Sequence, residues 1–204
     1  MIGIFGGSFN PIHNGHMQLA KQALKRLALD NVHFLPCANP VHRCALQVSS
    51  HDRLNMIRLS IANDDQFVVN RLELDRGGAS FMIDTLREVR GQHPNESIGF
   101  MLGADAFNDI LSWKQATKIL EVAHLIVCQR PEIKLDYNIF NERWVQSVDS
   151  LQHKKFGYVL PLAIKQSSCS STEIREQLAV SKPVISCLPR VVLEYIVNNH
   201  LYET

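Results

Sequence analysis

The chain has 204 residues, enough for one domain with a substantial buried core. Its 21 lysines and arginines nearly balance 20 aspartates and glutamates, which argues against a nucleic-acid or membrane partner attracted by bulk charge. Because no signal peptide opens the chain and no apolar run approaches a membrane span, we expect a cytoplasmic protein. We predict one domain over residues 1–204, with a C-terminal helical part from about residue 170, and leave open whether it forms a homo-oligomer.

The first predicted unit is a strand, a glycine loop and a helix. Ile2 to Phe5 form an apolar run that predicts a buried strand. Gly6 and Gly7 follow at once, so the backbone can approach a ligand closely there, and Pro11 stiffens the turn. Helical spacing then begins at Asn14, with an apolar face made by Met17, Ala20, Leu24 and Leu27.

Two histidines mark the start of this helix. His13 and His16 have the i, i+3 spacing that places both rings on the same side of the first turn. The N–H groups of a helix N-terminus attract anions, so the stretch predicts a phosphate site. A HxxH pair alone is more often a surface or structural feature, but the preceding strand, glycines and proline favour function here. Neither G-x-G-x-x-G nor a P-loop lysine is present.

Strands and helices alternate along the rest of the chain. We predict strands at 32–35, 67–69 with Leu72 and Leu74 in continued alternation, 98–102, 125–128 and 158–162. Helices are expected after Ser50 as a cap, after Ser80, around 119–122 and 139–145, from Ser170, and over 188–198. This order predicts a Rossmann-like α/β fold: a doubly wound parallel sheet with flanking helices, binding ligands beyond the carboxyl ends of its strands.

The five cysteines are odd in number and scattered. Because no CxxC occurs, we expect neither a disulfide framework nor a zinc ribbon, and reduced thiols suit a cytoplasmic protein. Cys37, His42 and Cys44 lie close enough to suggest part of a metal site, but a fourth ligand at a fitting spacing is missing. The sequence therefore predicts no metal site made by the chain itself.

A second polar cluster lies at residues 170–175. Ser170 and Glu173 fit a capping box, so the stretch can be simply a well-capped helix. Ser171, Thr172 and Arg175 would also place two hydroxyls and a guanidinium around one helix N-terminus, which makes a strong anion cradle. The spacing alone favours the structural interpretation.

Both clusters resemble motifs of the nucleotidylyltransferase superfamily. Residues 7–16 resemble its signature G-x-F-D-P-x-H-x-G-H, with Asn10 where the family usually has Asp, and residues 169–175 resemble its I-S-[AST]-T-x-[IL]-R motif. Asn10 keeps the size and an acceptor oxygen, so we interpret it as a residue that shapes the loop. The resemblance implies ATP-binding residues, which would be Gly6, Gly7, Ser8, Phe9, His16, Ser171, Thr172 and Arg175.

Further stretches resemble the bacterial nicotinate-nucleotide adenylyltransferases. They are the loop at 36–43, the segments 80–86 and 124–131, and Gly103-Ala104-Asp105 with the following Trp113. The resemblance implies a nicotinate-nucleotide site made by Asn39, His42, Arg43, Thr85, Asp105, Trp113 and Arg130, with the indole stacked on the pyridine ring. By residue type alone, Trp113 fits a core aromatic and Asp105 a helix N-cap equally well.

The resemblance also implies a reaction. AMP passes from ATP to nicotinate mononucleotide, giving nicotinate adenine dinucleotide (deamido-NAD) and pyrophosphate, with His13, His16 and Arg175 as catalytic residues. Mg²⁺ would accompany ATP, held mostly by phosphates and water because the sequence has no carboxylate cluster for it. Two alternatives remain: a pantetheine-phosphate adenylyltransferase, usually shorter and with Thr at the position of His13, and a catalytically silent nucleotide-binding protein on this fold.

Overall fold

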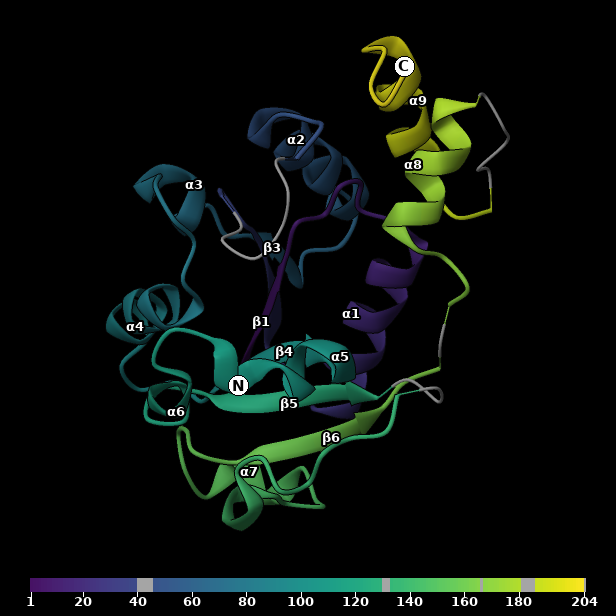
Figure 1. The fold of residues 1–204 in the computed structure, drawn as a ribbon. Coiled ribbons are helices and arrows are strands. Elements are labelled where there is room, and N and C mark those ends of the chain that lie inside the picture. Colours follow the sequence, from purple (N-terminus) through teal and green to yellow (C-terminus); the bar gives the residue numbers. More distant parts are fainter. Residues whose placement is uncertain (40–45, 130–132, 166, 181–185, 204) are drawn as a thin grey trace.

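The computed structural model describes residues 1–39, 46–129, 133–165, 167–180 and 186–203. A parallel six-stranded sheet with the order β3-β2-β1-β4-β5-β6 forms its centre (Figure 1). The strands are β1 (Ile2–Gly7), β2 (Asn31–Pro36), β3 (Phe67–Val69), β4 (Ile98–Gly103), β5 (His124–Gln129) and β6 (Val159–Ala163). The predicted parallel α/β sheet is confirmed.

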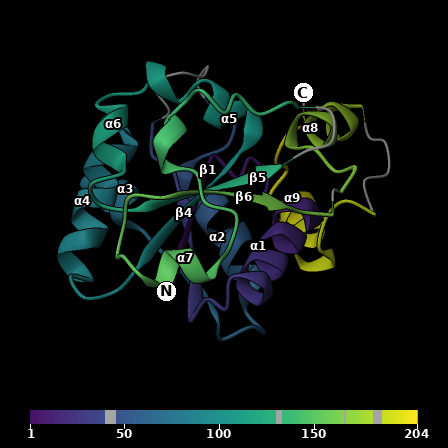
Figure 2. The same cartoon turned by 90° about the horizontal axis from the view of Figure 1, so that it is seen from below.

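Helices cover both faces of this sheet, as Figure 2 shows from below. One layer consists of α1 (Asn14–Arg26), α2 (Ser50–Ile61), α7 (Asp149–Gln152), α8 (Ser171–Ala179) and α9 (Arg190–Asn198). The other consists of α3 (Leu72–Arg76), α4 (Met82–Gln92), α5 (Ala104–Asn108) and α6 (Ala116–Ile119), with 3₁₀ turns η1 (Ile110–Ser112) and η2 (Asn141–Arg143). No helix of the described residues has the length and apolarity needed to cross a membrane.

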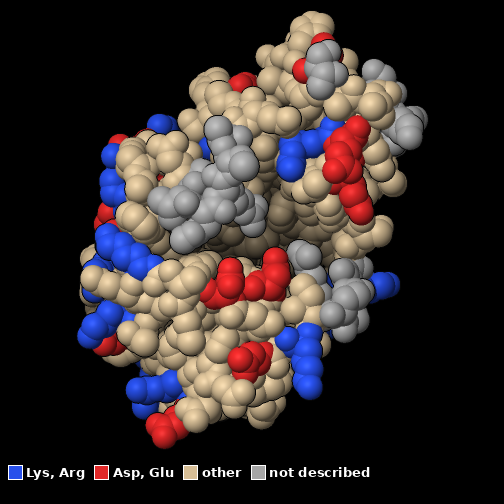
Figure 3. All heavy atoms as spheres, viewed as in Figure 1, with Lys and Arg blue, Asp and Glu red and all other residues tan. Residues whose placement is uncertain are grey.

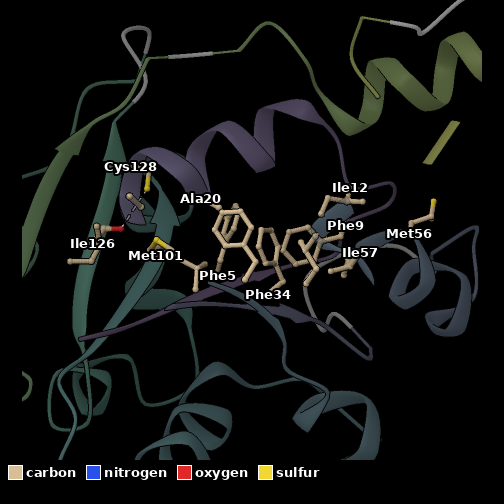
Figure 4. Close-up of a cluster of buried hydrophobic side chains, with 14 of the residues drawn as sticks. Phe5, Phe9, Ile12, Ala20, Phe34, Met56, Ile57, Met101, Ile126 and Cys128 are labelled. Carbon is tan, nitrogen blue, oxygen red and sulfur yellow. Dashed lines mark hydrogen bonds between the residues drawn. The ribbon is translucent and has the colours of Figure 1, made fainter. Parts of the chain in front are cut away.

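Successive strand residues point to the two layers in turn. Ile4 packs against the layer of α4, whereas its neighbour Phe5 packs against the layer of α1 and α2. Because both faces are covered, the strands are largely apolar, as parallel strands usually are. Figure 4 shows Phe5, Phe9 and Phe34 side by side, with the Phe5 ring centroid 5.4 Å from that of Phe9 and 5.6 Å from that of Phe34. This aromatic cluster supports the loop that follows β1.

The strand order reverses at β1. Its neighbour on one side is β2, the next strand in the chain, while on the other side it pairs with β4, which comes much later. The loops that leave β1 and β4 therefore diverge at their carboxyl ends and open a crevice, the usual ligand position in this architecture. Both strands end in glycine, at Gly7 and Gly103.

Three local predictions were wrong. Leu72 and Leu74 belong to α3 and do not extend β3, because the side chain of Asn70 accepts a hydrogen bond from the N–H of Leu72 at 3.0 Å and turns the chain. The helix expected at 139–145 is only the short turn η2. Ser49, one residue before the predicted cap, accepts the capping bond of α2 from the N–H of Asp52 at 3.1 Å.

The prediction about cysteines was also wrong. Cys169 and Cys187 form a disulfide, with their Cα atoms 5.3 Å apart and a sequence separation of 18. It joins the segment before α8 to the segment before α9. An odd cysteine count and irregular spacing gave no sign of this pair, since the fold alone brings the two segments together. The suggested partial metal cluster includes His42 and Cys44, which lie outside the described residues.

Candidate active site

The loop between β1 and α1 is flanked by two glycines, Gly7 at the end of β1 and Gly15 in the first turn of α1, that leave little room for a side chain. A Cβ atom on Gly15 would lie 2.9 Å from Nδ1 of His13, and one on Gly7 would lie 3.2 Å from the ring of Phe9. Phe9 itself has a positive φ of 46° and is 1 % exposed, so its ring belongs to the core below the loop. A contact of Phe9 with ATP would therefore have to use its main chain.

The two histidines stand together at the start of α1. Their rings are stacked with centroids 3.7 Å apart, and His13 is buried while His16 is partly exposed. The N–H of His13 donates to Nδ1 of His16 at 3.3 Å. Because that ring nitrogen accepts, a neutral His16 carries its proton on Nε2. The i, i+3 spacing does bring both rings to one place, as predicted.

Helix α8 meets this loop from the other end of the chain. The hydroxyl of Ser171 donates to the carbonyl oxygen of Pro11 at 3.0 Å, and Nη1 of Arg175 donates to that of Asn10 at 2.8 Å. Nη2 of Arg175 is 3.3 Å from the hydroxyl of Thr172. Ser170 caps the helix by accepting from the N–H of Glu173 at 3.2 Å. Residues 170–175 therefore form a capped helix start, and they also form a polar cluster that contacts the loop at residues 8–13, which we call the histidine loop.

A buried arginine that the sequence did not point out joins two loops of the site. Arg53 of α2 is 1 % exposed, and it donates to the carbonyl oxygen of Ser8 at 2.7 Å and to that of Cys37 at 2.8 Å. Burial lowers the pKa of Arg53 from its ordinary value. The carboxyl ends of β1 and β2 are therefore held at a fixed separation by one guanidinium. Its only signal in the sequence was a charged residue inside an otherwise apolar helix face.

The loop after β2 is tied to the segment before α4. The N–H groups of Ala38 and Asn39 lie 3.1 Å and 3.3 Å from the hydroxyl of Ser80, and the side-chain amide of Asn39 donates to the carbonyl oxygen of Gly78 at 3.0 Å. This places Asn39 beside the entrance to α4. The predicted residues His42, Arg43 and Arg130 lie outside the described residues.

Thr85 is the centre of a buried polar group on α3 and α4. Its side chain is fully buried; its hydroxyl donates to Oε1 of Glu73 at 2.9 Å and accepts from Nη2 of Arg76 at 2.9 Å. Arg76 also pairs with Glu88. The Thr85 hydroxyl is therefore committed to protein partners, and any contact with a ligand here would come from the neighbouring main chain. Glu73 was missed because its segment was taken for a strand.

Asp105 and Trp113 follow β4. Gly103 is the N-cap of α5, so the alternative of Asp105 as N-cap is wrong. A Cβ atom on Gly103 would lie 2.5 Å from Oδ1 of Asp105, which shows that the exposed carboxylate folds back over the glycine. Trp113 is partly buried, and its ring centroid lies 6.2 Å from that of Phe100. Its packing leaves part of the indole open to a ligand.

The molecular surface contains a depression. Figure 3 shows it between the part of the molecule that holds α8 and the part around β4 and β5. Acidic side chains line its lower edge in that view. Within the ranges that the structure describes, no three His, Cys, Asp or Glu side chains group together in a way that could hold a metal ion.

Comparison with known proteins agrees with this geometry. Residues 4–177 match the model of the Cytidylyltransferase-like family. A probable nicotinate-nucleotide adenylyltransferase of Thermus thermophilus is 39% identical over 202 residues, covering 99% of each chain, and one of Shewanella woodyi is 33% identical over 207 residues, covering 100% of this chain and 99% of the relative. The chain belongs to the nicotinate-nucleotide adenylyltransferases. The superfamily predicted from the two motifs and the family predicted from the further stretches are both confirmed.

A solved structure shares the fold. The nicotinic acid mononucleotide adenylyltransferase of Plasmodium falciparum, complexed with NaAD, superposes with a TM-score of 0.76 at 24% identity, covering 98% of this chain and 96% of its own. Within this adenylyltransferase architecture, His13, His16, Ser171 and Arg175 lie together around the loop after β1. Asn39 lies after β2, Thr85 lies on α4, and Asp105 and Trp113 follow β4; their roles remain predictions.

Proposed function

We propose that this chain transfers AMP from ATP to nicotinate mononucleotide, forming nicotinate adenine dinucleotide and pyrophosphate. The observation that carries the proposal is the meeting of Ser171 and Arg175 with the loop that holds the stacked His13 and His16. A hydroxyl, a guanidinium and a ring N–H donor thus come from both ends of the chain to one point. Such a set of donors suits a chain of phosphates.

In this mechanism a phosphate oxygen of nicotinate mononucleotide attacks the α-phosphorus of ATP in line. The new P–O bond forms as the bond to the bridging oxygen breaks, and pyrophosphate leaves with the electron pair. His16 donates from Nε2 to the α-phosphate, where negative charge grows in the transition state, with His13 packed beside it. Arg175, Ser171 and Thr172 hold the outer phosphates, and Arg175 and Ser171 exchange their bonds to loop carbonyls for bonds to phosphate oxygens.

The main chain of Gly6, Gly7, Ser8 and Phe9 lines the adenylate in this proposal. The acceptor nucleotide lies on the other side, with its pyridine ring on Trp113 and with Asn39 and Asp105 holding its polar parts. His42, Arg43 and Arg130 are proposed to reach its phosphate. Its carboxylate meets main-chain N–H groups at the first turn of α4, near Thr85, and beside Trp113. A carboxylate accepts from two such donors at once, while an amide leaves one of them unpaired.

Mg²⁺ is proposed to enter with ATP as part of the substrate, since Mg²⁺ commonly binds through substrate phosphates and keeps several waters. When bound it offsets negative charge on the phosphates. The described residues present no carboxylate cluster that would compete for this role. A cytoplasmic location, where ATP is abundant, fits the proposal.

The test is pyrophosphate release from ATP with one acceptor at a time. Nicotinate mononucleotide should support turnover, whereas phosphopantetheine and buffer alone should not. Nicotinamide mononucleotide should show a kcat/KM about 10²–10⁴ lower, because losing one charge-assisted bond and leaving a donor unpaired costs roughly 3–5 kcal/mol. Equal use of acid and amide would contradict the nicotinate assignment. Turnover with phosphopantetheine alone would favour the pantetheine-phosphate enzyme, and no turnover would favour a silent binding protein.

A further inference from the structure

The histidine loop is held by side-chain donors from three separate parts of the chain: α2, α8 and the residues that follow α9. Arg53 binds the carbonyl oxygen of Ser8, Arg175 binds that of Asn10, and Ser171 binds that of Pro11. A fourth donor belongs to neither motif. The hydroxyl of Tyr202, almost at the end of the chain, donates to Oδ1 of Asn10 at 2.7 Å.

Tyr202 is buried in the core beneath the site. It is 8 % exposed, Asn10 is 4 % exposed, and Tyr202 belongs to the same apolar cluster as Phe9 and Ile174. Its φ of 66° lies in the left-handed region, which a bulky residue adopts only where surrounding contacts compensate. Burial raises the pKa of Tyr202 well above its usual range, so its hydroxyl keeps its proton and remains a donor at neutral pH.

We infer that Tyr202 is a positioning residue for AMP transfer, acting through the side chain of Asn10. The inference rests on the proposed function. It concerns what keeps the loop in place, since Tyr202 itself lies behind Asn10 and is not proposed to contact a substrate.

The reason lies in the two oxygens of Asn10. Its carbonyl oxygen is held by Arg175, while its amide oxygen is held by Tyr202. When Arg175 turns from that carbonyl to the phosphates of ATP, its bond to Asn10 is lost. The bond from Tyr202 is then the one that still fixes Asn10, and with it the path of the chain from Gly7 to His13. A neutral amide oxygen is a sufficient acceptor for this purpose, which accounts for Asn at this position.

The test compares two substitutions of the same kind in the C-terminal part. Tyr202→Phe removes the hydroxyl and keeps the buried ring. Tyr195→Phe is the matched control, because the hydroxyl of Tyr195 donates to Asp52 at 2.8 Å and accepts from Asn55 at 3.0 Å, joining α9 to α2 without touching the loop. Both variants lose a partly or fully buried hydroxyl, so melting temperature alone would not separate them.

We expect Tyr202→Phe to lower kcat/KM for ATP by about 3- to 10-fold, the effect of one hydrogen bond, with the KM for nicotinate mononucleotide within about twofold of wild type. Tyr195→Phe should leave both values within about twofold. In a double-mutant cycle, Tyr202→Phe should have no further effect once Asn10→Ala is present. In an Asn10→Asp background, which keeps an acceptor oxygen, the loss on removing the hydroxyl should persist.

Three results would overturn the inference while leaving the proposed function intact: normal ATP kinetics for Tyr202→Phe, an equal loss for Tyr195→Phe, or additive losses in the cycle with Asn10→Ala. If Asn10→Ala does not fold, the comparison of the two tyrosine variants decides on its own. Absence of turnover by the wild-type chain with ATP and nicotinate mononucleotide would instead refute the proposed function.

Discussion

The two halves of the proposed site are held together in different ways. On the phosphate half, Ser171 binds Pro11, Arg175 binds Asn10 and Tyr202 binds Asn10, across sequence separations of 160, 165 and 192 residues. On the pyridine half, Thr85 binds Glu73 and Arg76 across separations of 12 and 9 residues. One half joins the two ends of the chain, and the other is built within a short segment.

The acceptors differ as well. Ser171, Arg175 and Arg53 all donate to main-chain carbonyl oxygens of the loop, which any residue supplies. The bonds around Thr85 join one side chain to another, so each partner must keep its chemical type. The donors to these carbonyl oxygens are therefore fixed in type, while the loop residues that accept only through the main chain can change; Asn10 differs because its side chain also accepts from Tyr202. Substitutions on the two halves should consequently affect different kinetic constants.

The largest effect is expected for His16→Ala on the phosphate half. Loss of a preorganised donor to growing charge should lower kcat by roughly 10²–10⁴. ATP affinity, measured by calorimetry with a non-hydrolysable analogue, should change much less, because the outer phosphates keep Arg175 and Ser171. His153→Ala, on the segment after α7 and away from the site, is the control. A near-normal kcat for His16→Ala would remove this histidine from the mechanism.

The next largest effect is expected when the disulfide of the phosphate half is removed. Cys187→Ser opens the link to Cys169, and for a loop of this length the unfolding free energy should fall by about 3 kcal/mol. The KM for ATP should rise because the segment before α8 is less restrained, while the KM for nicotinate mononucleotide should hold. Dithiothreitol should produce the same change in wild type and none in the variant. An unchanged melting temperature of the wild type in reductant would contradict the expectation.

On the pyridine half, Thr85→Val should act locally. It keeps the side-chain shape but leaves Glu73 and Arg76 without their shared partner, at a cost of about 1–3 kcal/mol in unfolding free energy. The KM for nicotinate mononucleotide should rise and the KM for ATP should not. Thr117→Val, at an exposed position of α6, is the matched control. A rise in both KM values would mean that the halves are not independent.

The sequence predicted the sheet and the meeting of the two histidine rings well, and the reason is physical. Buried parallel strands are short apolar runs bounded by turns, and their pattern survives without knowledge of the partners. His13 and His16 lie at one helix start, where local spacing brings their rings together. The role of Arg175 was implied by the family resemblance and remains a prediction. That Gly15 is needed for the His13 ring also follows a local rule, since the two residues are nearly adjacent.

The rest depends on contacts that sequence spacing does not encode. The disulfide between Cys169 and Cys187 and the bond from Tyr202 to Asn10 exist because α8 and α9 return to the loop after β1. Glu73 was missed for a different reason. Leu72 and Leu74 alternate as in a strand, but the side chain of Asn70 accepts a hydrogen bond from the N–H of Leu72 and turns the chain into α3. Tertiary contacts decided the first case, and a local side-chain bond that the alternating pattern does not reveal decided the second.

The smallest expected effect tests the turn at Asn70 through the pH dependence of the unfolding free energy. His33 of β2 lies 3.4 Å from the amide of Asn70 through its Nδ1, and Asn70 in turn starts α3. Burial, with a smaller contribution from His93, lowers the pKa of His33 below 6.5. The unfolded chain then binds the proton more readily. Unfolding free energy should therefore fall as the pH drops below 6.5, by at most about 1.4 kcal/mol per pH unit, until the lower folded-state pKa is passed.

Two glutamine variants separate this local effect from a general one. Burial also lowers the pKa of His124, which lies at the start of β5 with its ring bound to Lys154 and Tyr158. His33→Gln and His124→Gln should each reduce the pH dependence of the melting temperature between pH 7 and pH 5. The KM for nicotinate mononucleotide should rise as the pH falls over this range, because Asn70 supports α3 and the residues that hold Thr85. Only His33→Gln should reduce this rise in KM. An equal response of KM to both variants would show that acid destabilises the sheet as a whole, and that the pyridine half has no pH response of its own.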